Sequence, residues 1–182
     1  MGRTYTCIDE RLASFFLSQP VFFVATAPLS GDGLVNCSPK SNNGELAMLD
    51  PTRVGYLDRT GSGVETVAHL RENGRIVLMF CAFEDNPRIV RVHGRGSVVL
   101  RDDGAFAQLS RRFPTDNLDG ARSIIVVSVE RVSDSCGYGV PLMDFKTHRT
   151  KMAEWADRKG DDGIRRYWVT NNSESLDGLP GL

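Results

Sequence analysis

A run of small and hydroxyl-bearing residues, TGSGVET at residues 60–66, separates a segment typical of a strand from a segment typical of a helix. Residues 53–58 have the strand pattern, and residues 64–73 carry apolar side chains at helical spacing before Gly74, a common helix stop. A strand that turns through small residues into a helix leaves backbone N–H groups and hydroxyls free to bind an anion such as phosphate. Ser and Thr also cap ordinary helices, so this segment alone leaves both interpretations open.

Composition limits the classes of function. The 182 residues are enough to bury a substantial core and are expected to form a single domain, residues 1–182. The 22 basic and 23 acidic residues nearly cancel, which disfavours a nucleic-acid-binding protein that relies on a basic face. Four cysteines lie far apart, without a CxxC pair or a histidine at metal-ligand spacing, so we expect no metal site. Free thiols are typical of the reducing cytoplasm, where we expect the protein to act.

An apolar stretch near the start of the chain, residues 15–27, does not predict a membrane segment. Ser18, Gln19 and Pro20 interrupt it, and acidic residues precede it. It is too short and broken to span a bilayer and fits a signal peptide poorly. We therefore expect no membrane association.

The remaining pattern predicts a mostly β protein of the α+β class, with about six antiparallel strands and flanking helices. The expected strands are residues 21–27, 34–38, 53–58, 75–83, 88–100 and 123–132, and the expected helices are residues 9–19, 64–73, 105–113 and 151–167. Pro39 either ends the first hairpin or places it at a sheet edge. Two glycines within residues 88–100 indicate a bulge or sharp bend, as in a barrel. We expect a barrel core over about residues 20–133 and a helical tail over about residues 145–182, with Trp155 and Trp168 as its anchors.

Four segments of the sequence are informative because of the order in which they occur. They are a hairpin ending NCSPK at residues 36–40, the strand and turn at residues 56–66, a helix ending LRENGR at residues 70–75, and RIVRVHG at residues 88–94. In this order and spacing they resemble the pyridoxamine 5′-phosphate oxidase-like family of flavin-binding split β-barrels. The resemblance covers about residues 21–132. It implies a homodimer that binds a flavin, usually FMN, in a groove between the subunits.

The resemblance also implies which residues touch the cofactor. These are Asn36, Ser38, Lys40, Thr60, Ser62, Gly63, Thr66 and Tyr138. Lys40 would face the flavin phosphate or ring edge, and the turn residues would hold the phosphate. Asn36 and Ser38 alternate along one strand and so share a face, which would point towards the flavin. Tyr138 lies in a glycine-rich loop that suits either close approach to a planar ring or a plain turn.

Two departures argue against turnover of pyridoxamine phosphate itself. Ile89 stands where the vitamin-processing oxidases carry a glutamine that contacts the flavin. Those oxidases bind the substrate with an Arg-x-His pair. The only counterpart here is His148-Arg149, in which the two residues are adjacent and in reversed order. His69 and His93 are also isolated, and no nucleophile or paired-carboxylate motif is present, so the catalytic residues stay unknown. Such an absence is typical of a flavoprotein, in which the cofactor carries the electrons.

We therefore expect an FMN-dependent oxidoreductase that acts on an unidentified small organic substrate. One alternative is a deazaflavin-dependent reductase, since some split-barrel relatives use that cofactor. Its longer acidic tail would need a basic groove, which Arg91, Arg95, Arg111 and Arg112 could supply. A flavin or haem carrier without turnover is also compatible with the sequence, as is a barrel that has lost its ligand.

Overall fold

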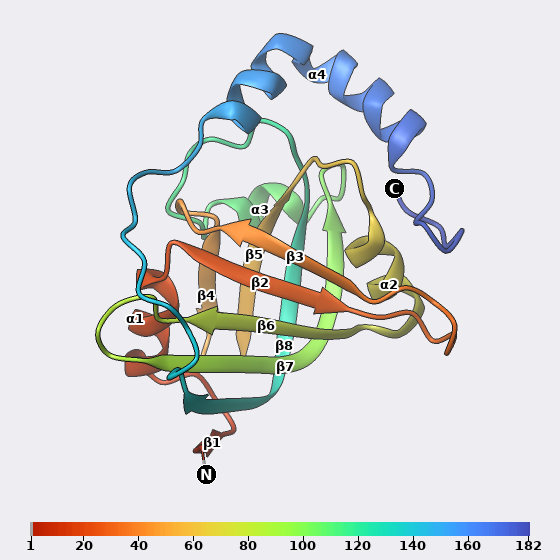
Figure 1. Ribbon diagram of the computed structural model, residues 1–182. Helices are drawn as coiled ribbons and strands as arrows, with labels where there is room; N and C mark the ends of the chain where they lie inside the picture. The colour runs from red at the N-terminus through yellow and green to blue at the C-terminus, as the bar shows by residue number, and fades with distance from the viewer. Residues whose placement is uncertain (1) are drawn as a thin grey trace.

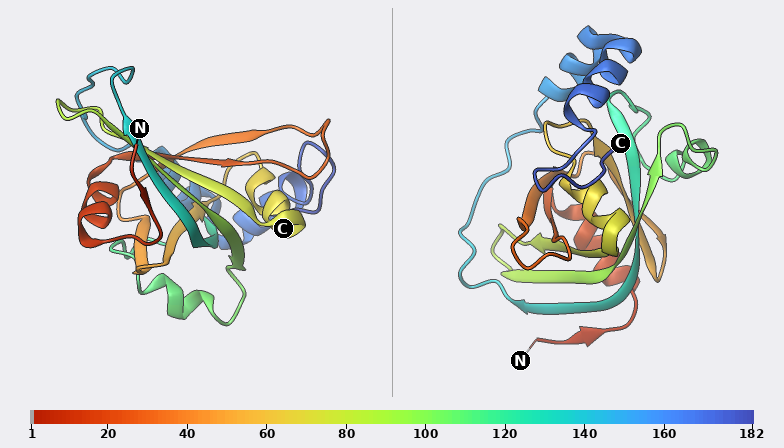
Figure 2. Two further views of the ribbon diagram at one scale, coloured as in Figure 1. Left: turned by 90° about the horizontal axis from the view of Figure 1, so that it is seen from below. Right: turned by 90° about the vertical axis from the view of Figure 1, so that its right-hand side faces the viewer.

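The computed structural model describes residues 2–182, which fold into one curled antiparallel sheet with flanking helices (Figure 1). In chain order the elements are β1 (Thr4–Tyr5), α1 (Glu10–Ser18), β2 (Val21–Thr26), β3 (Asn36–Ser41), β4 (Leu46–Asp50), β5 (Arg53–Arg59), α2 (Glu65–Asn73), β6 (Arg75–Cys81), β7 (Arg88–Leu100), α3 (Phe106–Ser110), β8 (Ala121–Cys136) and α4 (Lys151–Asn171). The strand order is β3-β2-β6-β7-β8-β5-β4, and β1 pairs with β8. The sheet curls into a half-barrel, which confirms the expected fold class (Figure 2).

The six expected strands are all present, and the structure adds two more. The sequence missed β1, which has two residues, and β4, which pairs only with β5 along the path of the sheet. Strands this short contain too few residues for an alternating pattern to emerge. β8 extends beyond the expected residues 123–132 at both ends. Pro39 lies within β3, opposite Phe23, and β3 is an edge strand, so the edge alternative is the one that the structure adopts.

The two longest strands, β7 and β8, turn the corner of the half-barrel together (Figure 1). Their register shifts between His93 and Gly94, which confirms the expected bulge. A Cβ atom at Gly94 would lie 2.1 Å from the carbonyl oxygen of Ser128. Only glycine therefore allows the two backbones to approach this closely.

Aromatic side chains fill the interior of the half-barrel. The rings of Phe16 and Phe80 stack at 4.3 Å between centroids, and Phe22 meets Tyr56 edge to face at 5.6 Å. Phe16 comes from α1, whose first turn is capped by Asp9 accepting from the Leu12 amide at 2.7 Å, as the sequence predicts. A second, smaller cluster under α3 packs against the outer side of β5 and β8. Together these contacts fix the position of β5, the strand that leads into the turn at residues 60–66.

The charged C-terminal helix α4 lies across one end of the half-barrel (Figure 2). It is broken at Gly160, whose φ of 62° and ψ of 170° lie outside the helical region. Of the two expected anchors, Trp168 donates from Nε1 to the Thr60 hydroxyl at 2.8 Å. After the helix, Asn172 is fully buried and donates to the carbonyl oxygens of Gly61 and Ser62. The C-terminal segment is therefore tied to the turn. No helix within residues 2–182 is both long and apolar enough to cross a membrane.

Candidate functional site

The turn at residues 60–66 presents backbone donors to its surroundings. The first backbone hydrogen bond of α2 runs from Ala68 to Val64, and no side chain caps this helix start. The N–H groups of the first turn therefore lack an intrahelical acceptor and carry the positive end of the helix dipole. Ser62 is exposed, and its carbonyl rather than its hydroxyl accepts a hydrogen bond, from Asn172. In the sequence, Gly63 lies between Ser62 and the first turn of α2. This is the arrangement that binds anions at helix starts.

Thr60 holds the turn through hydrogen bonds inside the protein. Its side chain is 1% exposed and donates to the Gly120 carbonyl at 2.7 Å while it accepts from Trp168. The Thr60 amide donates to the same carbonyl, also at 2.7 Å. Thr60 thus fixes the turn to the start of β8, and its hydroxyl has internal partners on both sides. Its contribution to a ligand site is the shape of the turn.

The inward face of β3 meets the start of α2. Asn36, Ser38 and Lys40 are half-buried on this face, and alternation predicts the common face of Asn36 and Ser38. Asn36 donates from Nδ2 to the hydroxyls of Thr26 and Thr66, each at 3.1 Å, and accepts from Ser38 at 2.9 Å. The structure therefore brings Asn36, Ser38 and Thr66 into one hydrogen-bonded group beside the turn.

Lys40 belongs to a buried ionic cluster that the sequence analysis missed. Its Nζ lies 2.8 Å from Asp58 Oδ1, and Arg122 Nε lies 2.8 Å from Asp58 Oδ2. Burial would raise the pKa of the Asp58 carboxyl, but the charges of Lys40 and Arg122 and their hydrogen bonds hold this pKa at about 2. Two cations against one carboxylate leave one positive charge in excess. Nη1 of Arg122 is buried without a partner in the part of the chain that the structure describes.

A signal for this cluster was present in the sequence. Asp58 ends an otherwise apolar run in β5, and Arg122 precedes the β-branched run of β8. Charged residues seldom become fully buried unless they are paired. Asp58 pairs with Ser123 across the sheet, next to Arg122. Asp58 lies just before Thr60 and Arg122 just after Gly120, and the hydrogen bond between Thr60 and Gly120 holds the turn. The cluster therefore lies beside the residues that hold the turn.

A histidine on α2 completes the hydrogen-bonded group. His69 is fully buried, with Nδ1 2.9 Å from the Thr26 hydroxyl and Nε2 3.9 Å from Asp177 Oδ2. Burial lowers the pKa of His69, and Asp177, Glu65 and Glu72 oppose this shift without reversing it. The ring is thus neutral in the fold at pH 7.

The lowered pKa of His69 makes stability depend on pH. Below about pH 6.5 the unfolded chain takes up a proton at this histidine that the folded protein does not, so the free energy of unfolding falls with pH. We expect His69→Gln to remove this part of the slope between pH 7 and pH 5, measured by urea unfolding. Equal slopes for the variant and the natural protein would contradict the assignment.

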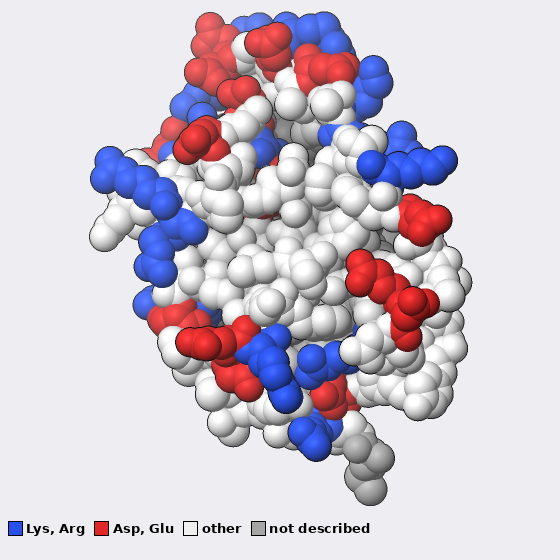
Figure 3. Space-filling view, turned by 90° about the vertical axis from the view of Figure 1, so that its left-hand side faces the viewer, with Lys and Arg blue, Asp and Glu red and all other residues white. Residues whose placement is uncertain are grey.

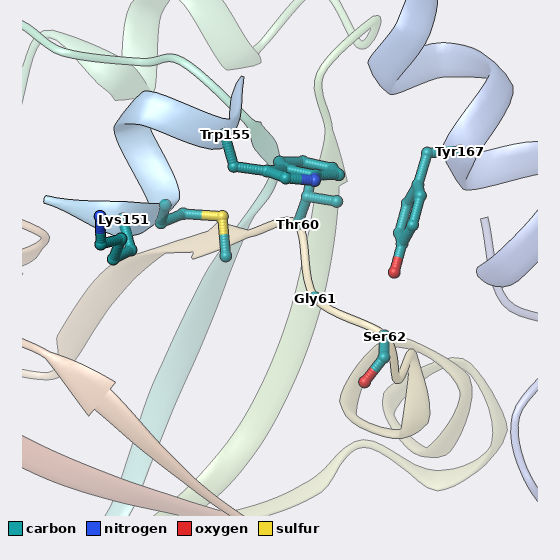
Figure 4. Close-up of a pocket in the computed structure, with 7 residues that line it drawn as sticks. Thr60, Gly61, Ser62, Lys151, Trp155 and Tyr167 are labelled. Carbon is teal, nitrogen blue, oxygen red and sulfur yellow. The ribbon is translucent and has the colours of Figure 1, made fainter. Parts of the chain in front are cut away.

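A pocket of about 330 Å³ lies between the turn and α4 (Figure 4). Its lining consists of Thr60, Gly61, Ser62, Lys151, Met152, Trp155 and Tyr167. Trp155 and Tyr167 come from opposite sides of the break at Gly160, and their rings meet at 5.1 Å with an 80° angle between planes. Tyr167 directs its hydroxyl towards the turn (Figure 4). The turn therefore has a polar face towards β3 and an aromatic pocket towards α4.

Tyr138 is the predicted site residue that lies away from the others in this chain. It follows β8 and is 84% exposed. The turn is held at the opposite end of β8, where Ala121 pairs with Arg59 and Gly120 accepts from Thr60. The surface on the side of α1 and the loop after β8 carries few charged side chains across its middle (Figure 3). Leu142, Met143 and Phe145 in that loop are also exposed, with the exposed charged residues Asp144 and Lys146 among them.

Solved structures share this fold. A crystal structure of HupZ from Group A Streptococcus matches with a TM-score of 0.53, at 19% identity over 70% of this chain and 99% of that one. A FAD-binding protein from Mesorhizobium loti matches with a TM-score of 0.50, at 16% identity over 74% of this chain and 96% of that one. At such identities the matches establish the fold alone.

Sequence comparison goes further. The profile of the family described as pyridoxamine 5′-phosphate oxidase matches residues 8–136, most of the chain. A pyridoxamine 5′-phosphate oxidase family protein of Aspergillus flavus, ustO, is 40% identical over 192 aligned positions, which cover 98% of this chain and 77% of the relative. The split half-barrel, the ordered segments and these matches agree. The chain belongs to the pyridoxamine 5′-phosphate oxidase family.

Proposed function

We propose that this protein binds a flavin, with the flavin phosphate at the turn, and uses it to oxidise or reduce a small organic substrate. The observation that carries the proposal is the row of N–H groups at the start of α2, which have no intrahelical or side-chain acceptor within residues 2–182, together with a buried cluster that has one excess positive charge. A dianionic phosphate gains from backbone donors, a hydroxyl and a nearby cation together. The buried Nη1 of Arg122 without a partner in residues 2–182 also fits a missing anion.

The residues present fit this cofactor in named roles. Ser62 and the N–H groups around Gly63 would hold the phosphate, and Lys40 would support it through its charge. Asn36 and Ser38 would face the flavin ring from β3. The bound flavin would supply hydride or electron transfer, while the chain supplies position and electrostatics.

The choice of a flavin over a deazaflavin rests on an argument about charge. The M. loti neighbour binds FAD by its name, which supports a flavin in general. A deazaflavin with an acidic tail would need free arginines, but Arg95 pairs with Glu130 and Arg91 contacts Ser135. Arg112 donates to the Leu49 carbonyl at 2.8 Å. Three of the four arginines named for such a groove therefore already have partners, which favours a flavin without that tail.

A homodimer belongs to the same proposal. The exposed side chains of Tyr138, Leu142, Met143 and Phe145 would be covered by a second copy of the chain. A second copy could also bring its own Tyr138 towards a flavin, which would explain why this residue lies away from the turn in one chain.

Flavin titration tests the proposal. We expect the purified protein to bind FMN saturably, observed as a change in the visible absorbance spectrum. Ser62→Ala should weaken binding about tenfold, because it removes one hydrogen bond to a charged group. Ser62→Asp should abolish measurable binding, because it places a negative charge against the phosphate.

The matched control is Ser128→Ala, at an exposed serine of β8 that lies outside the turn. This variant should bind FMN as the natural protein does. Failure of the natural protein to bind any flavin would reject the proposed function. Equal affinities for all of the Ser62 and Ser128 variants would move the phosphate away from the turn.

A further inference from the structure

The pocket between the turn and α4 has features of a site for a planar ring. Trp155 and Tyr167 form two walls at nearly a right angle, and Met152 adds an apolar side chain. A planar ligand ring could stack on one aromatic face and meet the other with its edge. Its volume of about 330 Å³ falls in the usual range for small-molecule sites.

The break in α4 is what brings these walls together. Trp155 lies before Gly160 and Tyr167 after it, and the non-helical φ of 62° at Gly160 redirects the chain between them. A Cβ at Gly160 would meet nothing within 4 Å, so space does not require glycine there. The positive φ does, because it is a backbone conformation that other residues rarely adopt. The bend is therefore encoded by the sequence.

The position of the pocket indicates which ligand ring it could bind. This argument rests on the proposed function, with the phosphate at the turn and the flavin ring on the β3 side. The pocket lies on the opposite side of the turn and shares Gly61 and Ser62 with it. FMN ends at its phosphate and would leave the pocket empty. FAD continues beyond that phosphate into a second phosphate, a ribose and an adenine ring.

We propose that the pocket receives the adenine end of FAD, so that this protein prefers FAD to FMN. Adenine would stack against Trp155 or Tyr167, and base–aromatic stacking is a strong contact that needs no specific hydrogen bond. Lys151 lies at the rim and is highly exposed, and its surface pair with Glu154 at 3.2 Å is weak enough to exchange for a phosphate.

Isothermal titration of the cofactor-free protein with FMN and with FAD tests this proposal. We expect FAD to bind at least tenfold more tightly than FMN. Trp155→Leu and Tyr167→Leu should each weaken FAD binding about tenfold and leave FMN binding unchanged, as loss of a stacked base predicts. Val169→Ala, at an exposed residue of α4 that does not line the pocket, is the matched control and should alter neither affinity. Thermal unfolding verifies that each variant is folded.

Each contrary outcome decides against part of the argument. Equal binding of FMN and FAD, unchanged in both pocket variants, would overturn the FAD preference and leave the proposed function standing. Equal weakening of both flavins in Trp155→Leu and Tyr167→Leu would overturn it too, because the pocket would then act on the part that the two cofactors share. No binding of either flavin would reject the proposed function itself.

Discussion

Replacing Asp58 with asparagine is expected to lower the free energy of unfolding by about 3–5 kcal/mol, a large effect for a single substitution. The carboxylate is fully buried between Lys40 and Arg122, each 2.8 Å away. Without it, two cations remain close together, one of them almost fully buried, and no carboxylate compensates them. For a chain of this length the loss corresponds to a fall in Tm of roughly 6–20 °C.

Asp102→Asn is the matched control. Asp102 pairs with Arg165 at 2.7 Å, but both side chains are more than half exposed. Exposed pairs contribute about 1 kcal/mol or less, so this variant should unfold nearly as the natural protein does. Similar losses of stability in the two variants would contradict the argument from burial.

The same carboxylate gives stability a defined response to acid. Its pKa is about 2 in the fold, against an ordinary value of 3.8. The stabilisation is therefore complete above about pH 4 and is lost as pH falls towards 2. Urea unfolding across this window should show a steeper loss for the natural protein than for Asp58→Asn, since the variant no longer carries the group that titrates.

Gly94→Val should have the second-largest effect, a loss of about 3 kcal/mol in the free energy of unfolding. A Cβ at this position would collide with the Ser128 carbonyl at 2.1 Å. That oxygen belongs to the backbone of β8, so the collision cannot be relieved by rotating a side chain. The two strands must separate at the corner of the half-barrel, which also strains the hydrogen bonds on either side.

Gly104→Val provides the comparison for this variant, because a Cβ at Gly104 meets nothing within 4 Å. Chemical denaturation should separate the two variants by more than about 2 kcal/mol. If Gly94→Val were as stable as Gly104→Val, the glycine at the bulge would not be required for close approach of the strands.

The sequence predicted the half-barrel well because its main strands carry strong local signals. Residues 75–83 and 123–132 are nearly continuous apolar runs, and the glycines of β7 indicated the bend. β4 was missed although three of its five residues are buried, since its sequence LAMLD contains no clear alternation. The break in α4 was missed as well, because a lone glycine in a charged helix is compatible with an unbroken helix.

Prediction of the candidate site was less complete, for a physical reason. Alternation along one strand predicted that Asn36 and Ser38 share a face, and both are half-buried on it, as is Lys40, which lies beyond the expected end of that strand. The partners of that face come from elements distant in sequence: Arg122 lies 64 residues after Asp58. Such contacts depend on the pairing of strands, which local patterns do not specify. The same is true of Thr60, whose hydroxyl donates to the Gly120 carbonyl and accepts from Trp168 Nε1.

The hydrogen bonds from Asn172 to the turn have a consequence for the kinetics and entropy of ligand binding. Its amide fixes the Gly61 and Ser62 carbonyls in one orientation, so their peptide planes cannot flip freely. Arg71 also donates to the Gly181 carbonyl, which binds the same segment to α2. The flavin phosphate that we propose for the turn would therefore meet a rigid receptor and would lose little affinity to ordering the loop. Folding has already supplied the order that association would otherwise have to create.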